Sequence, residues 1–287
     1  MKTKSTLNLA MMFIALSSAG QKYAVEVMAA EAGTWGYCNE KGAVIVPTTY
    51  RDAGEFSEDG WAVVQDVKGQ YFFLGIDGGR LIGQALDISK VKGGFHDGLV
   101  AVRIGHRWGY MNTLGKIVIP TRYEQAVEFQ EGLAAASRDS KYYIVNTSGE
   151  ETLIVGSPIA LIRHFSEKLA PFDNGTHFGF INAEGKVGIQ PIYKGVGYFH
   201  DRIAWARDDR SGLIGFLNTK GEWVFKPQFS YVINPHPDSR WVRCKREEHW
   251  MYVNPQGQEL TVTDCDAWGD FADGLAPGKK NGAWGFF

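Results

Sequence analysis

Acidic side chains recur at regular intervals along the chain, and they are the first candidates for catalysis or ligand binding. They are Glu58, Asp59, Asp97, Glu131, Glu167, Asp201 and Asp273. One interpretation is a ring of carboxylates that binds a metal ion or a sugar. We favour the other interpretation, because an active site needs asymmetry and these acids recur regularly. In it, each carboxylate accepts hydrogen bonds from the backbone N–H groups of a turn.

Histidines are a second set of reactive groups. His96 and His200 both occur as Phe-His-Asp in an expected surface loop, so solvated side chains are predicted rather than a metal pair. No histidine has a serine, cysteine or carboxylate at a spacing that indicates a catalytic triad. We therefore predict no catalytic residue, no cofactor and no metal. An enzyme is the weakest alternative and would need a pocket where several acids or histidines converge.

Aromatic side chains could stack on a sugar, and the chain has nine tryptophans. Trp205 and Trp268 carry the hypothesis of a glycan-binding, lectin-like module, which is favoured if both are exposed in one groove. Trp223 lies two residues past a turn glycine, where strand core is expected. The other six belong to two sets that recur at equivalent positions of the sequence repeat described below. One set is Trp35, Trp108, Trp250 and Trp284, and the other is Trp61 and Trp241.

Two segments depart from the sequence repeat described below. Functional residues are expected where a repeated scaffold departs from its own pattern. The first is a charged loop at residues 207–211. The second, residues 234–246, has two prolines and a histidine, followed by a basic, aromatic strand. Ordinary solvated loops are the alternative. The candidate residues for binding a ligand or partner are Arg207, Asp209, Arg210, His236, Trp241 and Arg243.

The regular pattern is a repeat whose clearest copy starts at Trp108-Gly109-Tyr110. Leu133 marks a second position that recurs with the same period. Two markers that share one period, roughly 36 residues, indicate a repeat architecture. The positions equivalent to Gly109 are 34 to 37 residues apart: Gly36, Phe72, Gly109, Tyr143, Gly179, Gly215, Met251 and Gly285.

Within one unit, the residue pattern predicts four short strands and no helix. Residues 108–112 and 116–119 read as strands on either side of a tight turn that ends with a glycine. Pro120 is expected to stop the second strand, because proline cannot donate to a ladder. A third strand is expected at Tyr123 and a fourth at residues 133–136. The predicted fold class is all-β.

One such unit cannot bury its apolar face alone, so neighbouring units must stack. We favour a seven-bladed β-propeller-like ring over an open β-repeat stack, or solenoid. The markers predict seven repeats plus a C-terminal strand, and in a closed ring that strand would pair beside the first repeat. A sequence cut short in its eighth unit is the alternative.

The Trp-Gly pairs at 35–36, 108–109 and 284–285 make the chain resemble the bacterial WG-repeat family. The resemblance covers about residues 33–287, and the first, third, fifth and sixth copies are the strongest. It implies a β-rich repeat domain that is often exported. It carries over no catalytic motif.

The first residues have the order of a secretory signal. Lys2 and Lys4 precede an apolar run from Leu7 to Leu16, and small residues follow as far as Gly20. We expect residues 1–19 to be a signal peptide, 20–32 a linker and 33–287 the WG-repeat domain. An exported protein, periplasmic or extracellular, is predicted, with a cytoplasmic protein as the alternative. No later stretch reaches transmembrane length.

The composition narrows the function further. A formal net charge of −2 argues against a nucleic-acid-binding surface. Three cysteines indicate no disulfide framework, although Cys265 could approach Cys38 if the ring closes. We predict a monomeric, non-catalytic binding or scaffolding protein whose partner is another protein or a cell-envelope component.

Overall fold

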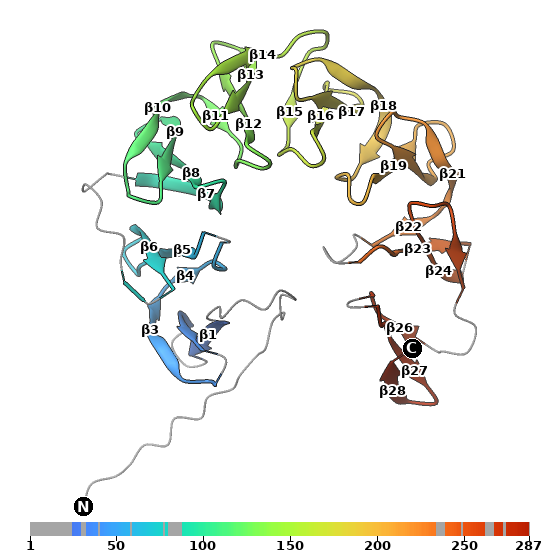
Figure 1. Ribbon diagram of the computed structural model, residues 1–287, viewed down its shortest axis with the longest axis horizontal. Coiled ribbons are helices and arrows are strands. Elements are labelled where there is room, and N and C mark those ends of the chain that lie inside the picture. The colour runs from blue at the N-terminus through green and yellow to red at the C-terminus, as the bar shows by residue number, and fades with distance from the viewer. Residues whose placement is uncertain are drawn as a thin grey trace, which may run out of the picture. The chain divides into compact units, whose positions relative to one another are not determined.

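The computed structural model describes residues 25–29, 33–39, 41–57, 59–76, 78–79, 88–233, 239–247, 249–261, 267–271 and 274–286. The chain forms two compact units, residues 1–141 with 145–151, and residues 142–144 with 152–287. All regular elements in the described residues are β-strands, as Figure 1 shows. The all-β prediction is therefore confirmed.

The first unit contains strands β1 to β12, and residues of both units contribute to β13 (Lys141–Asn146) and β14 (Glu151–Leu153). Their sheets have the orders β1-β2-β3, β4-β5-β6, β10-β9-β8-β7 and β11-β12-β13-β14. The bounds are β1 (Val25–Ala29), β2 (Thr34–Cys38), β3 (Val44–Tyr50), β4 (Asp52–Ala53), β5 (Trp61–Gln65), β6 (Tyr71–Gly75), β7 (Ile88–His96), β8 (Leu99–Ile104), β9 (Arg107–Asn112), β10 (Ile117–Tyr123), β11 (Gln125–Ala126) and β12 (Leu133–Arg138).

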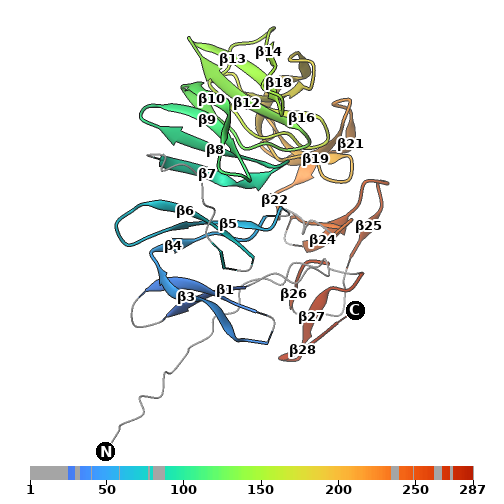
Figure 2. The same ribbon diagram turned by 60° about the vertical axis from the view of Figure 1, so that its left-hand side comes forward.

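The second unit contains a seven-stranded sheet, β15 to β21 in sequence order, followed by the sheets β22-β23-β24-β25 and β26-β27-β28. The bounds are β15 (Leu161–Ile162), β16 (Leu169–Asp173), β17 (Phe178–Asn182), β18 (Val187–Val196), β19 (Ile203–Asp208), β20 (Ile214–Asn218), β21 (Trp223–Phe229), β22 (Tyr231–Val232), β23 (Val242–Arg246), β24 (His249–Val253), β25 (Glu259–Leu260), β26 (Ala267–Trp268), β27 (Pro277–Lys280) and β28 (Ala283–Phe286). Figure 2 shows the same strands from another side.

In the four-stranded sheets, the fourth strand of one sequence repeat pairs with the first strand of the next repeat, which pairs in turn with the second. In the third sheet, β8 pairs with β9 from Leu99↔Asn112 to Ile104↔Arg107. Strand β9 pairs in turn with β10 through the turn at Asn112 to Gly115, whose ends are joined by a backbone hydrogen bond of 2.9 Å. The hydrogen-bonded unit is therefore shifted by half a repeat from the unit visible in the sequence.

The prediction that Pro120 ends the second strand is wrong. Strand β10 runs from Ile117 through Pro120 to Tyr123, with a register shift between Ile119 and Tyr123. A bulge leaves residues out of the ladder, so proline can lie there without removing a needed donor. The separate third strand predicted at Tyr123 is instead the end of β10.

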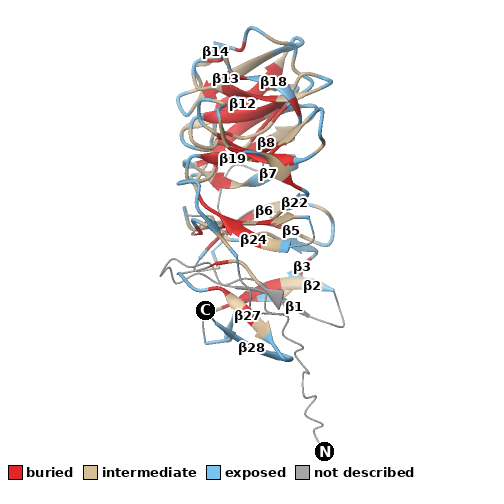
Figure 3. Ribbon diagram, turned by 90° about the vertical axis from the view of Figure 1, so that its right-hand side faces the viewer, coloured by how far each residue is buried: buried red, intermediate tan, exposed pale blue. Residues whose placement is uncertain are grey.

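The Trp-Gly glycine gives its neighbouring strand room to lie close. A Cβ atom added at Gly109 would lie 2.6 Å from the carbonyl oxygen of Ile119 in β10. The next residue, Tyr110, is fully buried and lies edge-on against Phe129. Figure 3 shows such buried strand centres along the chain. The strands β2, β9, β17 and β20, which carry the Trp-Gly position, each place a buried aromatic side chain in the core.

The C-terminal strand β28 pairs with the preceding strand β27 in the second unit. Strand β28 pairs with β27 from Pro277↔Phe286 to Lys280↔Ala283, while β2 pairs with β1 and β3. The turn between β27 and β28 has positive φ at Asn281 and Gly282. An Asn-Gly turn of this kind favours a two-residue hairpin, which explains the local pairing. Closure of a ring stays a prediction.

Candidate functional site

The recurring carboxylates bond to the backbone of the following repeat. An Asp97 oxygen accepts a hydrogen bond from the Gly132 N–H at 2.8 Å, and an Asp59 oxygen accepts one from the Gly98 N–H at 2.9 Å. For these acids, the interpretation as turn acceptors is confirmed. What the sequence did not reveal is that the turn belongs to the following repeat.

The same contact recurs in the second unit. Both oxygens of Glu167 accept from the N–H of Arg202, at 2.9 and 3.0 Å. Glu58 and Asp273 lie outside the described residues. In the part of the chain that the structure describes, no group of three His, Cys, Asp or Glu side chains is placed to hold a metal ion.

The histidines of the Phe-His-Asp segments are not simply solvated, so that prediction is wrong. His96 Nδ1 lies 3.0 Å from Gln130 Nε2, and His200 Nε2 lies 2.8 Å from the carbonyl oxygen of Ser239. Both side chains are half-buried. Because each ring contacts the next repeat, these loops carry packing contacts where free polar groups were expected.

Three of the candidate binding residues lie at the end of β19 and in the turn that joins it to β20. Arg207 donates to the Gly212 carbonyl at 2.6 Å. Asp209 Oδ1 lies 3.4 Å from both His177 Nε2 and Lys194 Nζ. Arg210 is exposed. The turn itself is ordered by Asp208, whose carboxylate accepts from the Ser211 N–H and hydroxyl.

These hydrogen bonds also hold the pKa of Asp208 below its usual value. The backbone and hydroxyl bonds from Ser211 are its main cause, since both favour the charged carboxylate. The turn is therefore held by a carboxylate that stays ionised to a lower pH than an ordinary aspartate does.

The two other candidates among the described residues, Trp241 and Arg243, contact side chains of the second unit. Arg243 Nε lies 3.1 Å from Asp270 Oδ1, and its guanidinium lies 5.5 Å from the Trp250 ring centroid. Trp241 packs against Phe271. Arg207 to Arg210 lie at the end of β19, whereas Trp241 directly precedes β23, so the two groups occupy opposite ends of equivalent strands. His236 lies outside the described residues.

Trp205, a candidate for sugar stacking, is packed against the chain. A Cβ atom added at Gly197 would lie 2.3 Å from Trp205 Nε1, so one face of the indole covers that backbone. Its other contacts are with the core cluster that includes Ile203 and Phe216. The side chain of Trp268 lies outside the described residues.

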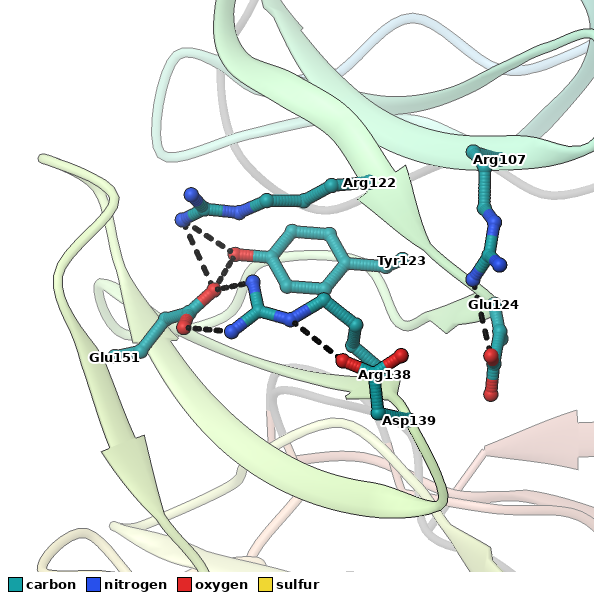
Figure 4. A network of polar contacts seen from close by, with 7 residues as sticks. All are labelled: Arg107, Arg122, Tyr123, Glu124, Arg138, Asp139 and Glu151. Carbon is teal, nitrogen blue, oxygen red and sulfur yellow. Dashed lines mark hydrogen bonds and ion pairs between the residues drawn. The ribbon is translucent and has the colours of Figure 1, made fainter.

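The sequence did not predict a network of ion pairs and hydrogen bonds around Glu151 in the first unit (Figure 4). Glu151 accepts a hydrogen bond of 2.6 Å from the Tyr123 hydroxyl. Arg138 donates to both carboxylate oxygens, at 3.1 and 3.0 Å, and Arg122 lies 2.9 Å away. Burial raises the pKa of Glu151, but the Tyr123 hydrogen bond and the two arginines outweigh it, so the pKa lies below its usual value.

The network joins strands β10, β12 and β14. Burial and the hydrogen bond to Glu151 raise the pKa of Tyr123 to about 12. An equivalent pair, Arg246 and Glu259, has the same separation of 13 residues and bidentate contacts of 2.9 and 3.0 Å. That recurrence is the signal by which the sequence could have revealed it, and it indicates a packing role.

Two described cysteines are buried and form no disulfide: Cys38 and Cys244. Burial raises the pKa of Cys244 to about 12, so its thiol stays protonated at neutral pH. Cys265 lies outside the described residues. Its predicted approach to Cys38 stays a prediction.

Comparison with known proteins identifies the repeat. The model of the family described as WG containing repeat matches residues 35–71, 108–142, 178–209 and 214–236. The matched segments contain strands β2, β9, β17 and β20, in which the Trp-Gly position lies. No curated protein matches the chain.

Solved structures resemble the chain at low sequence identity. BamB from Moraxella catarrhalis is 13% identical with a TM-score of 0.45, and the match covers 93% of this chain and 92% of that one. A eukaryotic initiation factor is 10% identical with a TM-score of 0.49, covering 90% of each chain. PorZ, a surface component of the type-IX secretion system of Porphyromonas gingivalis, is 10% identical with a TM-score of 0.43, covering 89% of this chain. This chain spans 40% of the length of PorZ.

Proposed function

We propose that this chain, a WG-repeat protein with a β-propeller-like fold, is a non-catalytic binding or scaffolding protein. It presents loops from its β-repeat body to another protein or to a component of the cell envelope. The supporting observation is how the polar side chains are used. The repeated acids and histidines bond to neighbouring loops, whereas the turn 207–213, which departs from the repeat, exposes charged and apolar side chains.

The turn is well suited to binding because it is ordered before any partner arrives. The Ser211 bonds to Asp208, at 2.8 and 2.7 Å, and the Arg207 bond to Gly212 fix its backbone. A preorganised loop loses less conformational entropy on association than a flexible one. Its exposed tip combines Asp209, Arg210 and Leu213, a mixture that fits a protein surface.

The glycan-binding alternative receives less support. An indole that stacks on a sugar needs an open face. The Trp205 ring lies on the backbone of Gly195 and Gly197 and packs into the core. We therefore place the partner at the charged turn.

The test uses a tagged full-length chain purified from its native cell, with two double variants compared side by side. The Asp209→Ala, Arg210→Ala variant removes the charges of the turn. The Glu184→Ala, Lys220→Ala control removes the same charges from exposed, regular repeat turns. We expect one partner to bind the wild type and the control and to be lost with the first variant. Equal recovery with both variants would overturn the assignment of the turn.

We also propose that the protein is exported, because residues 1–19 have the order of a secretory signal. These residues lie outside the described part. Within the described residues, no helix has the length and apolar character needed to span a bilayer. Mass spectrometry of the native N-terminus should find a chain that starts after Ala19. A cytoplasmic chain that retains the leader would reject export.

A further inference from the structure

The sheet β10-β9-β8-β7 in the first unit contains a pair of like charges that the repeat does not require. Lys90 in β7 lies opposite Arg103 in β8. Like charges directly opposite each other destabilise a sheet. At the equivalent position of the other described sheets, no pair combines two charged residues. Those pairs are Asp52–Gln65, Gln125–Ser137, Leu161–Asp173, Gly195–Arg207, Tyr231–Lys245 and Ala267–Lys279.

Strand β7, which carries Lys90, also departs from the repeat in its length. It has nine residues, whereas the equivalent strands β4, β11, β15, β22 and β26 have two each. A register shift between Ile88 and Lys90 places a bulge at Ser89. Bulges re-aim nearby side chains and are common next to functional sites. The longer strand exposes Lys90 and Lys92 on one of its faces.

Hydrogen bonds hold two of these cations in place. Arg103 Nε donates to the Ser89 hydroxyl at 3.2 Å, and that hydroxyl donates to the Arg103 carbonyl at 3.1 Å. Lys92 Nζ donates to the Ala126 carbonyl at 3.2 Å and keeps two further N–H donors. Among the described residues, no partner takes up the terminal N–H groups of Arg103. The cations are therefore positioned while donors remain for an anion.

The acids of the following repeat do not neutralise the opposed pair. Glu124 is paired with Arg107 at 3.0 Å. Glu128 lies against backbone further along β7. Over the part of the chain that the structure describes, neither Lys90 nor Arg103 forms an ion pair. The sheet thus keeps a repulsion at an exposed position, and such a departure from the repeat indicates a functional surface.

We propose that Lys90, Lys92 and Arg103, the β7 cation patch, bind an acidic segment of a partner polypeptide. A carboxylate placed between Lys90 and Arg103 replaces their repulsion with two attractions, and the arginine can bind it through two parallel hydrogen bonds. Clusters that contain arginine are a known means of recognising acidic motifs. The proposal goes beyond the one made for the turn at 207–213, because it concerns a surface of the first unit.

Geometry and charge favour a short, extended segment as the occupant. Lys90 and Lys92 are two residues apart on one strand, roughly 7 Å along its axis. An extended peptide with an acid at every second residue presents carboxylates at the same interval. The whole chain has a net charge of −2, although residues 88–112 contain four Lys or Arg side chains and one acid. A long polyanion would therefore meet repulsion outside the patch.

The test measures binding of the labelled peptide Ser-Glu-Ser-Glu-Ser-Glu to the full-length chain by fluorescence anisotropy, at low ionic strength, where exposed charges are least screened. The same peptide with glutamine in place of glutamate is the neutral control. Lys90→Glu is the informative variant, because its own carboxylate would pair with Arg103 and occupy the patch. Lys116→Glu is the matched variant, since it makes the same charge change at an exposed turn of the same sheet.

We expect the wild type and Lys116→Glu to bind the acidic peptide and not the neutral one. Lys90→Glu should bind at least about tenfold more weakly. Its melting temperature should exceed that of the wild type, because the opposed charges now attract. A purely structural role for Lys90 would instead lower the melting temperature of this variant.

Equal binding by Lys90→Glu and the wild type, or a lower melting temperature of Lys90→Glu, would overturn the proposal. Dextran sulfate provides a second arm, and its binding without any binding of the acidic peptide would show that the patch recognises a polyanion other than a polypeptide, which also overturns the proposal. The Asp209→Ala, Arg210→Ala variant should bind the peptide as the wild type does, so that failure of this proposal and failure of the assignment of the turn can be told apart.

Discussion

At the scale of single residues, the turns before the fourth strands are the most demanding positions. Both central residues have positive φ, 56° and 77° at Glu131 and Gly132, and 47° and 69° at Asp201 and Arg202. Glycine reaches this region without steric cost, whereas other residues do not. Arg202 therefore keeps a strained conformation at a position that is glycine in several other copies, while its N–H still bonds to Glu167.

Replacing Arg202 with glycine should stabilise the protein. Relief of the left-handed strain exceeds the entropy that glycine adds to the unfolded chain, so we expect a gain of about 0.5–1 kcal/mol. The backbone bond to Glu167 does not involve the side chain and should persist. Urea unfolding of the variant gives the value, and Gly132→Arg is the reverse control that should lose stability. A loss for Arg202→Gly would show that the arginine side chain makes a larger contribution than the strain.

A second prediction concerns the buried hydroxyl of Tyr110, which donates to the Val127 carbonyl at 2.8 Å. Equivalent bonds run from Tyr37 to Gly54 and from Tyr252 to Gly269. Tyr110→Phe should cost about 1–2 kcal/mol, because the Val127 carbonyl loses its donor. Tyr110→Leu should cost more, since it also removes ring packing against Phe129. No loss for Tyr110→Phe, measured by chemical unfolding, would contradict a role for the hydroxyl, and equal losses for both variants would contradict the contribution of ring packing.

At the scale of elements, the strands could largely be predicted, and their partners only in part. Residues 107–112 and 133–138 form strands close to the predicted ranges, because alternation and turn glycines act locally. The end predicted at Pro120 failed, since a bulge is set by the approach of β10 to Gly109 across the sheet. The Arg138–Glu151 pairing was also missed, because it depends on which strands become neighbours.

The close approach at Gly109 leads to a sharp prediction. Gly109→Ala should destabilise the first unit by about 3 kcal/mol, since the new methyl group meets backbone that cannot rotate away. Gly285→Ala should be nearly neutral, because nothing lies within 4 Å of the added atom. Thermal unfolding of both variants tests the difference. Similar losses would mean that the glycine is required by its own conformation and not by the adjacent strand.

At the scale of the whole molecule, the repeat was readable because two markers share one period through both units. For Asp59, Asp97 and Glu167, the acceptance of turn N–H groups was correctly predicted, although the position of those turns in the following repeat was not. That contact links residues 35 or 39 positions apart, as in Asp97–Gly132 and Asp59–Gly98. The candidate residues at 207–210 and 241–243 could be chosen only as departures from the pattern, and no local signal shows their partner.

The response of the molecule to acid follows from Glu151. Its folded pKa lies below the ordinary value of 4.5, so its interactions stabilise the protein above that value and are lost as the pH falls through the folded pKa. Glu151→Gln should lower stability at pH 7 and flatten the decline of the melting temperature below about pH 4.5. Scans of both proteins between pH 7 and pH 3 test this. Parallel curves would show that other carboxylates dominate acid unfolding.

The half-repeat shift between sequence unit and sheet has an evolutionary consequence. A duplication or deletion of one whole period changes the number of sheets by one, wherever in the repeat the exchange of DNA begins. A contact such as that of Asp97 with Gly132, or of Glu167 with Arg202, then forms again between the repeats that become neighbours. Chains of this kind can therefore lengthen or shorten by recombination while keeping these contacts between successive repeats.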